Sequence, residues 1–226
     1  MNPIKLLSLR GFACAAALLV LGNLSSCGIL PKKEVVQIIV PQVKVAADPS
    51  WPSVRWQLSI ARPDADRLTD SSRLVVSPTP GTLQVYAGAA WADRAPDLLQ
   101  SVLVAGFEDS GKIVAVARQA NSVHADYTLL LDIREFVAVY ANPAAAPEAT
   151  VELSARLIEN SSARVVAARI FRQVEPASGT AVPAVAQAFD GALNKLLPEM
   201  IGWTLNSGAD AFHGAAAPVE KRKPRK

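Results

Sequence analysis

Residues 149–174 of the sequence, ATVELSARLIENSSARVVAARIFRQV, decide the fold. Apolar and polar side chains alternate up to a polar turn at Asn160–Ser162, and the alternation resumes beyond that turn. A period of two places successive side chains on opposite faces of a strand. The stretch therefore predicts an antiparallel hairpin of two strands, Ala149–Glu159 and Arg164–Val174, with one face buried and the other in water.

The residues before this hairpin supply shorter strands. Trp56–Ala61 carries large apolar groups at alternate positions, and Pro78–Gly81 is a strong turn signal between two apolar runs. Val35–Val45 is rich in β-branched residues, but Pro41 would confine such a strand to a sheet edge or break it. The remaining predicted strands are Leu74–Val76, Leu83–Tyr86, Ile113–Ala117 and Tyr127–Tyr140.

Two helices are predicted. The first spans Arg94–Ser110, because Asp93 can cap it and Pro96 stands in its first turn, where a missing N–H costs nothing. Gly111 then ends it. The second spans Pro183–Leu205, where apolar side chains recur at intervals of three and four residues.

Together these elements predict an α+β fold with a single domain, residues 54–206. Its sheet is expected to be mostly antiparallel with about five strands, and the two helices to pack on one face of it. Residues 27–53 are expected to form a tether with an edge strand. Residues 207–226, rich in Ala, Gly and Pro and then basic, favour a disordered tail.

The N-terminus has the pattern of an export signal. Lys5 and Arg10 precede the apolar run Gly11–Leu21, which is too short to span a bilayer. Leu24-Ser25-Ser26-Cys27 then matches the bacterial lipobox, so we expect removal of residues 1–26, with cleavage after Ser26, and acylation of Cys27. The alternative is an ordinary secreted protein, but Cys27 would be the only cysteine left and could form no internal disulfide. Gly28, where Asp would retain a lipoprotein in the inner membrane, favours the outer membrane.

The charge distribution argues against nucleic-acid binding. The whole chain has a formal net charge of +3, of which Lys5 and Arg10 contribute two and residues 218–226, PVEKRKPRK, contribute four. The remaining body is therefore close to −3 and offers no basic face.

The sequence shows no catalytic constellation. The two histidines are His124, beside Asp126, and His213 in the predicted tail, and no Gly-x-Ser-x-Gly motif accompanies any serine. The glycines form neither a P-loop nor a dinucleotide fingerprint, and zinc would lack ligands. We therefore expect no enzyme activity, cofactor or metal, and the competing hypothesis is a hydrolase that uses His124.

Several segments, in order and spacing, carry a resemblance to one family across about residues 54–205. They are Trp56-Gln57-Leu58, Arg73-Leu74-Val75-Val76, Leu83-Gln84-Val85-Tyr86, Trp91-Ala92-Asp93, Phe107-Glu108-Asp109-Ser110-Gly111, Ala125-Asp126-Tyr127, Ala155-Arg156-Leu157, Ala168-Arg169-Ile170-Phe171, Ala188-Phe189-Asp190 and Trp203. With them the chain resembles the ABC-type transport auxiliary lipoproteins.

The resemblance implies a function that the residues alone do not supply. Such lipoproteins accompany transporters that have an ATPase, a permease and a mammalian-cell-entry (MCE) substrate-binding protein, and that move lipids between two membranes. It implies an outer-membrane lipoprotein facing the periplasm, with the MCE protein as its partner. Whether the domain itself binds phospholipid or forms a homo-oligomer stays open, and an envelope-assembly or structural lipoprotein is the alternative.

Overall fold

The computed structural model describes residues 36–121, 124–142 and 145–215. The predicted cleavage site at Ser26 and lipidation site at Cys27 lie outside these residues. The helices are α2 (Ala95–Ser110) and α3 (Val182–Ala215), with a 3₁₀ turn at Gln119–Asn121. The strands are β1 (Gln37–Ile39), β2 (Val54–Ile60), β3 (Asp64–Ala65), β4 (Arg73–Thr79), β5 (Thr82–Trp91), β6 (Ile113–Arg118), β7 (Tyr127–Val139), β8 (Glu148–Glu159) and β9 (Arg164–Pro176).

The β8–β9 hairpin confirms the prediction from residues 149–174. The strands pair antiparallel from Glu148 opposite Pro176 to Glu159 opposite Arg164. Ala163 turns the chain with a φ of 52°, in the left-handed region. The apolar side chains of β8 are fully buried at Val151, Leu153, Ala155 and Leu157.

Strand β7 organises the rest of the sheet. Along one edge it pairs antiparallel with β8 over its whole length, from Tyr127 opposite Glu159 to Val139 opposite Glu148. Along the other edge it pairs in succession with β2, β3 and β4, all parallel to it. Three short segments are needed there because none of them is long enough to cover a strand of 13 residues.

The sheet therefore differs from the predicted one. It is a mixed sheet of nine strands among the described residues, and β1–β5 and β2–β6 are further parallel pairs. The expectation of about five mostly antiparallel strands was wrong. The physical reason is that side-chain alternation reports which face is buried, whereas pairing direction depends on where each connection returns the chain.

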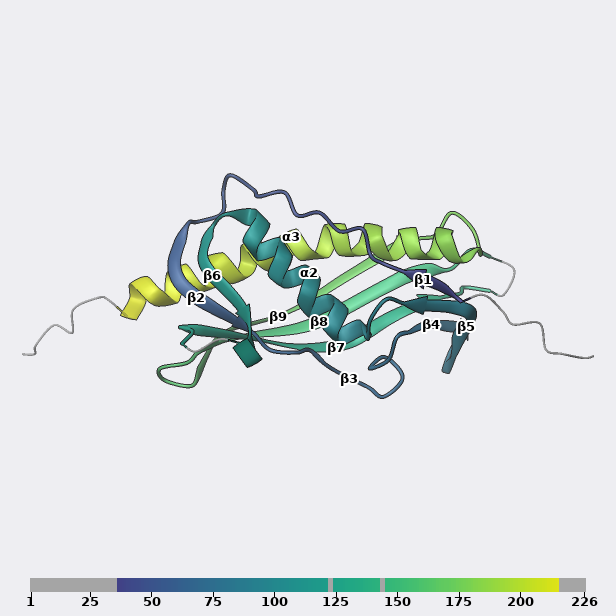
Figure 1. Ribbon diagram of the computed structural model, residues 1–226, viewed down its shortest axis with the longest axis horizontal. Coiled ribbons are helices and arrows are strands. Elements are labelled where there is room, and N and C mark those ends of the chain that lie inside the picture. The colour runs from purple at the N-terminus through teal and green to yellow at the C-terminus, as the bar shows by residue number, and fades with distance from the viewer. Residues whose placement is uncertain (1–35, 122–123, 143–144, 216–226) are drawn as a thin grey trace, which may run out of the picture. The chain divides into compact units, whose positions relative to one another are not determined.

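The two helices lie on the same side of the sheet, as predicted (Figure 1). Helix α2 contacts β6 and α3, and α3 contacts β8 and β9. Pro96 stands in the first turn of α2, and Gly111 ends it with a φ of 60°. The prediction that Asp93 caps α2 was wrong. The N-cap residue is Arg94, and its side chain makes no capping hydrogen bond. Among the described residues no helix has the length and apolarity that crossing a membrane requires.

Helix α3 continues ten residues beyond the predicted end at Leu205, so residues 207–215 are helical and not part of a disordered tail. Two glycines of α3 explain how its C-terminal half packs closely against the core. A Cβ added to Gly208 would lie 2.4 Å from Cζ2 of Trp56, and one added to Gly202 would lie 2.5 Å from Nε1 of Trp51. The two glycines thus form notches on α3 that admit two buried tryptophans.

An extended segment, Val40–Val45, follows β1 and lies along α3; we call it the strap. The predicted strand over Val35–Val45 is limited to β1, which pairs with β5, and Pro41 follows it. The Asn194 side chain on α3 forms with the strap backbone the kind of hydrogen bonds that a neighbouring strand would form. Its amide oxygen accepts from Lys44 N at 2.9 Å, and its nitrogen donates to the Gln42 carbonyl at 3.1 Å. The folded domain therefore begins with β1 and the strap, ahead of residue 54.

Replacing Asn194 with Ala is expected to release the strap. The substitution removes two hydrogen bonds to strap backbone, each worth about 1 kcal/mol net. Amide hydrogen exchange at residues 42–45 should quicken roughly tenfold or more, while exchange in β8 stays unchanged. Equal acceleration in both regions would show that Asn194 supports the whole domain and not the strap alone.

Asp190 predicts a pH dependence of the same segment. Its Oδ1 accepts from Gln42 N at 2.9 Å. Burial raises the pKa of the Asp190 carboxyl, and the Gln42 hydrogen bond opposes that rise. A carboxyl whose pKa is raised by folding favours the folded state while protonated, and this contribution is lost as pH rises through the folded pKa.

Asp190→Asn should therefore have the same free energy of unfolding as wild type below about pH 4, the pKa of Asp in the unfolded chain. Near neutral pH its free energy of unfolding should equal or exceed that of wild type. The amide keeps an oxygen for Gln42 N and cannot ionise. Urea denaturation of both proteins at acidic and neutral pH measures the difference. Wild type gaining stability over Asp190→Asn as pH rises would contradict the assigned direction.

Candidate functional site

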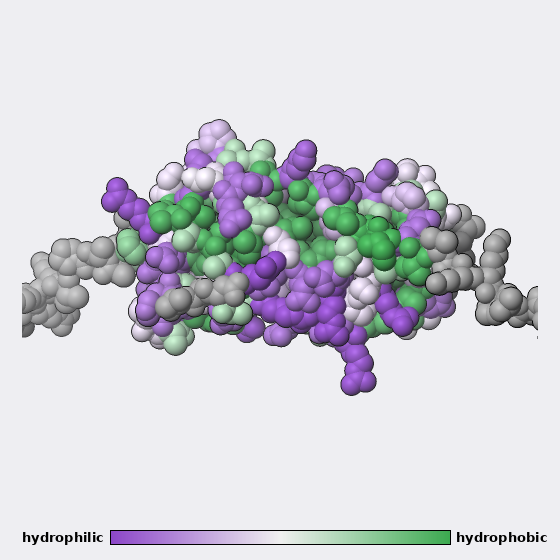
Figure 2. Space-filling view, in the orientation of Figure 1, coloured by the Kyte–Doolittle hydropathy of each residue, from purple (hydrophilic) through white to green (hydrophobic). Residues whose placement is uncertain are grey.

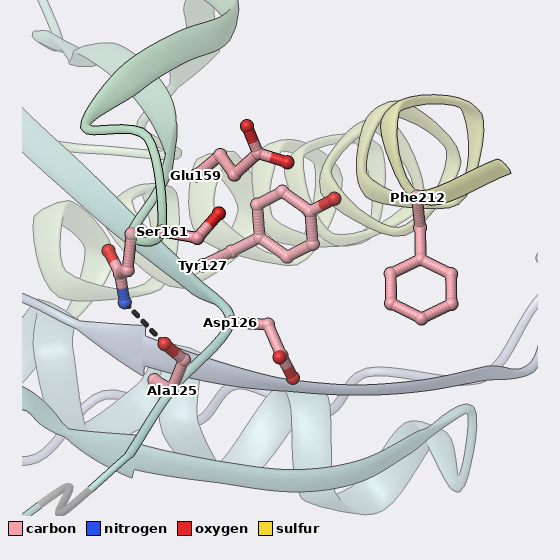
Figure 3. Close-up of a pocket in the computed structure, with 7 residues that line it drawn as sticks. Ala125, Asp126, Tyr127, Glu159, Ser161 and Phe212 are labelled. Carbon is pink, nitrogen blue, oxygen red and sulfur yellow. Dashed lines mark hydrogen bonds between the residues drawn. The ribbon is translucent and has the colours of Figure 1, made fainter. Parts of the chain in front are cut away.

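A pocket with carboxylate and aromatic side chains in its lining lies where β7 begins, beside the β8–β9 turn and the last turns of α3 (Figure 3). It has a volume of about 620 Å³. Three separate parts of the chain line it: Ala125, Asp126 and Tyr127; Glu159, Asn160 and Ser161; and Phe212. No pattern in the sequence predicted that these three parts would meet.

Asn160 and Asp126 hold the pocket walls together. The Asn160 side chain donates to the Ala125 carbonyl at 2.6 Å and accepts from the Thr128 hydroxyl at 2.8 Å. Asp126 Oδ2 accepts from Gln57 N at 2.7 Å, and Asp126 N donates to the Gln57 carbonyl at 3.0 Å. Asp126 therefore joins β2 to the start of β7.

The pocket carries negative charge next to aromatic rings. In Figure 3 the Tyr127 ring lies between the carboxylates of Glu159 and Asp126, and Phe212 faces it from α3. Burial raises the pKa of the Tyr127 hydroxyl, and the two carboxylates add to the rise, so the hydroxyl stays protonated. Arg164 lies 3.6 Å from Glu159 and offsets part of its charge. Such a lining suits a polar or cationic group of a partner.

The candidate catalytic residues do not come together at this pocket. His124 is exposed and does not line it, although it precedes Asp126 by two residues. The side chain of His213 is outside the described residues. Within the described ranges, no three His, Cys, Asp or Glu side chains are grouped so that they could hold a metal ion. The hydrolase hypothesis for His124 stays a prediction.

A smaller hollow of about 380 Å³ lies at the other end of β7. Tyr86 on β5 and Tyr140, just after β7, meet there through their hydroxyl groups at 2.5 Å. Burial raises the pKa of the Tyr86 hydroxyl, and the bond to Tyr140 adds to it. Since β7 has 13 residues, each rising about 3.3 Å, the two hollows are separated by roughly 40 Å. We call the Tyr127 end of β7 the distal end and the Tyr140 end the tether end.

A mixed sheet covered by two helices on one side defines a small α+β domain. Residues 37–200 match the model of the ABC-type transport auxiliary lipoprotein component family, and the chain belongs to that family. The match begins at β1, in agreement with a domain that includes the strap.

Two relatives support the family assignment. The crystal structure of protein XCC0632 from Xanthomonas campestris is 47% identical, covers 79% of this chain and 99% of that one, and superposes with a TM-score of 0.75. The uncharacterized protein bll6063 of Bradyrhizobium diazoefficiens is 34% identical over 150 residues, which are 66% of this chain. The matched region spans 39% of that relative's length.

Proposed function

We propose that this chain is a lipid-anchored docking component of an MCE-type ABC transporter that moves lipids between membranes, held on the periplasmic face of the outer membrane. The observation that carries the proposal is family membership over residues 37–200, which makes the chain an auxiliary lipoprotein of an ABC transport system. The MCE partner, the lipid cargo and the outer membrane go beyond that membership and are parts of the proposal.

The geometry supports docking through the distal end. The chain from Cys27 enters the domain at β1, which pairs in parallel with the last residues of β5, so a membrane anchor would lie toward the tether end. The pocket at Tyr127 lies about 40 Å farther along β7. It holds exposed polar groups and Phe212, which is 47% exposed, and aromatic groups beside charges are common in protein interfaces.

The test is capture of the partner by the full-length lipidated chain in crosslinked cells. We expect wild type to recover an MCE protein. Ser161→Arg, which places a long side chain at the pocket, should lower recovery about tenfold, a loss of about 1.4 kcal/mol. Ser178→Arg is the matched control, because Ser178 is also exposed and follows β9 at the tether end.

Two results would count against the proposal. Recovery of an outer-membrane barrel or peptidoglycan, with no MCE protein, would favour the envelope-assembly alternative. Equal recovery of the MCE protein by both arginine variants would retain the partner and exclude the distal pocket as its contact.

A further inference from the structure

Strand β1 and the strap expose a row of apolar side chains. Val36, Ile38 and Val40 are 51%, 63% and 59% exposed, and their spacing of two places them on one side of an extended segment. The alternate residues Ile39, Val43 and Val45 pack against the core. Farther along the outward side the row continues with Gln42 and Lys44, so it is apolar only where the chain enters the domain.

Leu83 is a further exposed apolar residue toward the same end of the domain. Strand β1 is parallel to β5, with Gln37 opposite Ala89. The chain therefore enters β1 from the side of the domain on which β5 begins. Leu83, 56% exposed, is the second residue of β5. We call Val36, Ile38, Val40 and Leu83 the apolar row. Figure 2 shows hydrophobic surface in green at the end of the domain where β1 lies.

The length of chain before β1 limits how far the apolar row can lie from the predicted anchor. Nine Cα–Cα steps separate Cys27 from Val36. At about 3.3–3.6 Å per step the greatest reach is roughly 30 Å, which is shorter than the separation of the two hollows. Lys32 and Lys33 fall within this stretch, and cations of this kind are attracted to anionic headgroups.

We propose that the apolar row rests on the bilayer surface, among the lipid headgroups and upper acyl chains, and sets the orientation of the domain. The proposal rests on the lipid anchor at Cys27. Acyl chains supply the membrane affinity, while a few aliphatic side chains add contact at the interface and fix which end faces the lipid. The distal pocket then points away from the membrane.

A second copy of the chain fits the apolar row less well than a lipid surface does. A stable protein interface buries about 800 Å² on each partner, and four partly exposed aliphatic side chains fall short of that area. The outward side chains change from apolar to polar with distance from the anchor. This change fits shallow insertion into a lipid surface better than it fits a continuous protein contact.

Single-cysteine labelling tests the proposal on the lipidated protein. Cys27 would be acylated and Cys14 removed with the signal, so Ile38→Cys and Val114→Cys each introduce one free thiol. Val114, on β6, is 68% exposed and is a matched apolar control, because β6 pairs with β2 beside the start of β7, toward the distal end. Each variant carries an environment-sensitive fluorophore and is reconstituted in phosphatidylethanolamine–phosphatidylglycerol vesicles with or without brominated lipid.

We expect the Ile38→Cys label to shift to the blue and to lose about half or more of its emission to brominated lipid, as a group at the interface would. The Val114→Cys label should keep its aqueous emission. If vesicles float with the protein but the Ile38→Cys label stays aqueous, or shifts without quenching as in a protein contact, the proposal is overturned while the anchor stands. If the protein does not float at all, both the anchor and this proposal fail.

Discussion

Replacing Phe189 with Ala is expected to lower the free energy of unfolding by about 3–5 kcal/mol, since a fully buried aromatic ring leaves a cavity. Phe189 is fully buried on α3. Its ring centroid lies 5.2 Å from that of Trp91 on β5 and 4.8 Å from that of Phe136 on β7. The ring therefore joins the long helix to two strands far apart in the sequence, and few substitutions would disturb as many elements.

Urea denaturation followed by tryptophan fluorescence measures this loss, and Trp91 beside the cavity is a direct reporter. Val114→Ala is the control, because Val114 is exposed on an edge of the sheet and its truncation should change stability by no more than about 0.5 kcal/mol. A Phe189→Ala protein that unfolds within about 1 kcal/mol of wild type would mean that α3 is not packed on this core.

Replacing Cys27 with Ser is expected to abolish incorporation of labelled palmitate and to leave a precursor that keeps residues 1–26. The thiolate is the nucleophile that takes the lipid, and a serine hydroxyl is not. The variant also lacks the acyl chains, which supply about 0.8 kcal/mol of membrane affinity for each buried methylene.

Cys14→Ser is the matched control, because Cys14 lies in the apolar run that precedes the predicted cleavage site. It should incorporate palmitate and be processed as wild type is. Retained labelling in Cys27→Ser with loss in Cys14→Ser would contradict the predicted lipobox, and so would labelling in neither the variants nor wild type.

The sequence predicted the elements whose pattern is local. Apolar side chains alternate from Val151 to Leu157 in β8, Pro96 stands in the first turn of α2 and Gly111 ends that helix, and both helices pack on one side of the sheet as their apolar stripes indicated. These features depend on neighbours within a few residues, so a single sequence contains the information.

Features that depend on distant partners could not be predicted in this way. The end of α3 depends on Trp56 fitting against Gly208, residues 152 positions apart. The strap is held by Asn194, whose amide replaces a strand edge. The parallel pairing of β2, β3 and β4 with β7 follows from connections between elements, which leave no periodic signal.

The same limit applies to the candidate site. In the sequence Asp126 stood beside His124, Glu159 ended a predicted strand, and Phe212 fell in the predicted tail. Only the antiparallel register of β7 and β8 and the added turns of α3 bring them to one pocket. Phe212, an aromatic residue about two helical turns beyond Leu205, was a signal that α3 could continue.

Site-specific photo-crosslinking in living cells tests docking through the distal end most directly. A photoreactive amino acid is placed at Ser161, beside the pocket, or at Leu83, in the apolar row. We predict that Ser161 yields an adduct with an MCE protein and Leu83 yields none. An MCE adduct from Leu83 without one from Ser161 would contradict the proposed docking. The absence of an MCE adduct from both positions would contradict it as well.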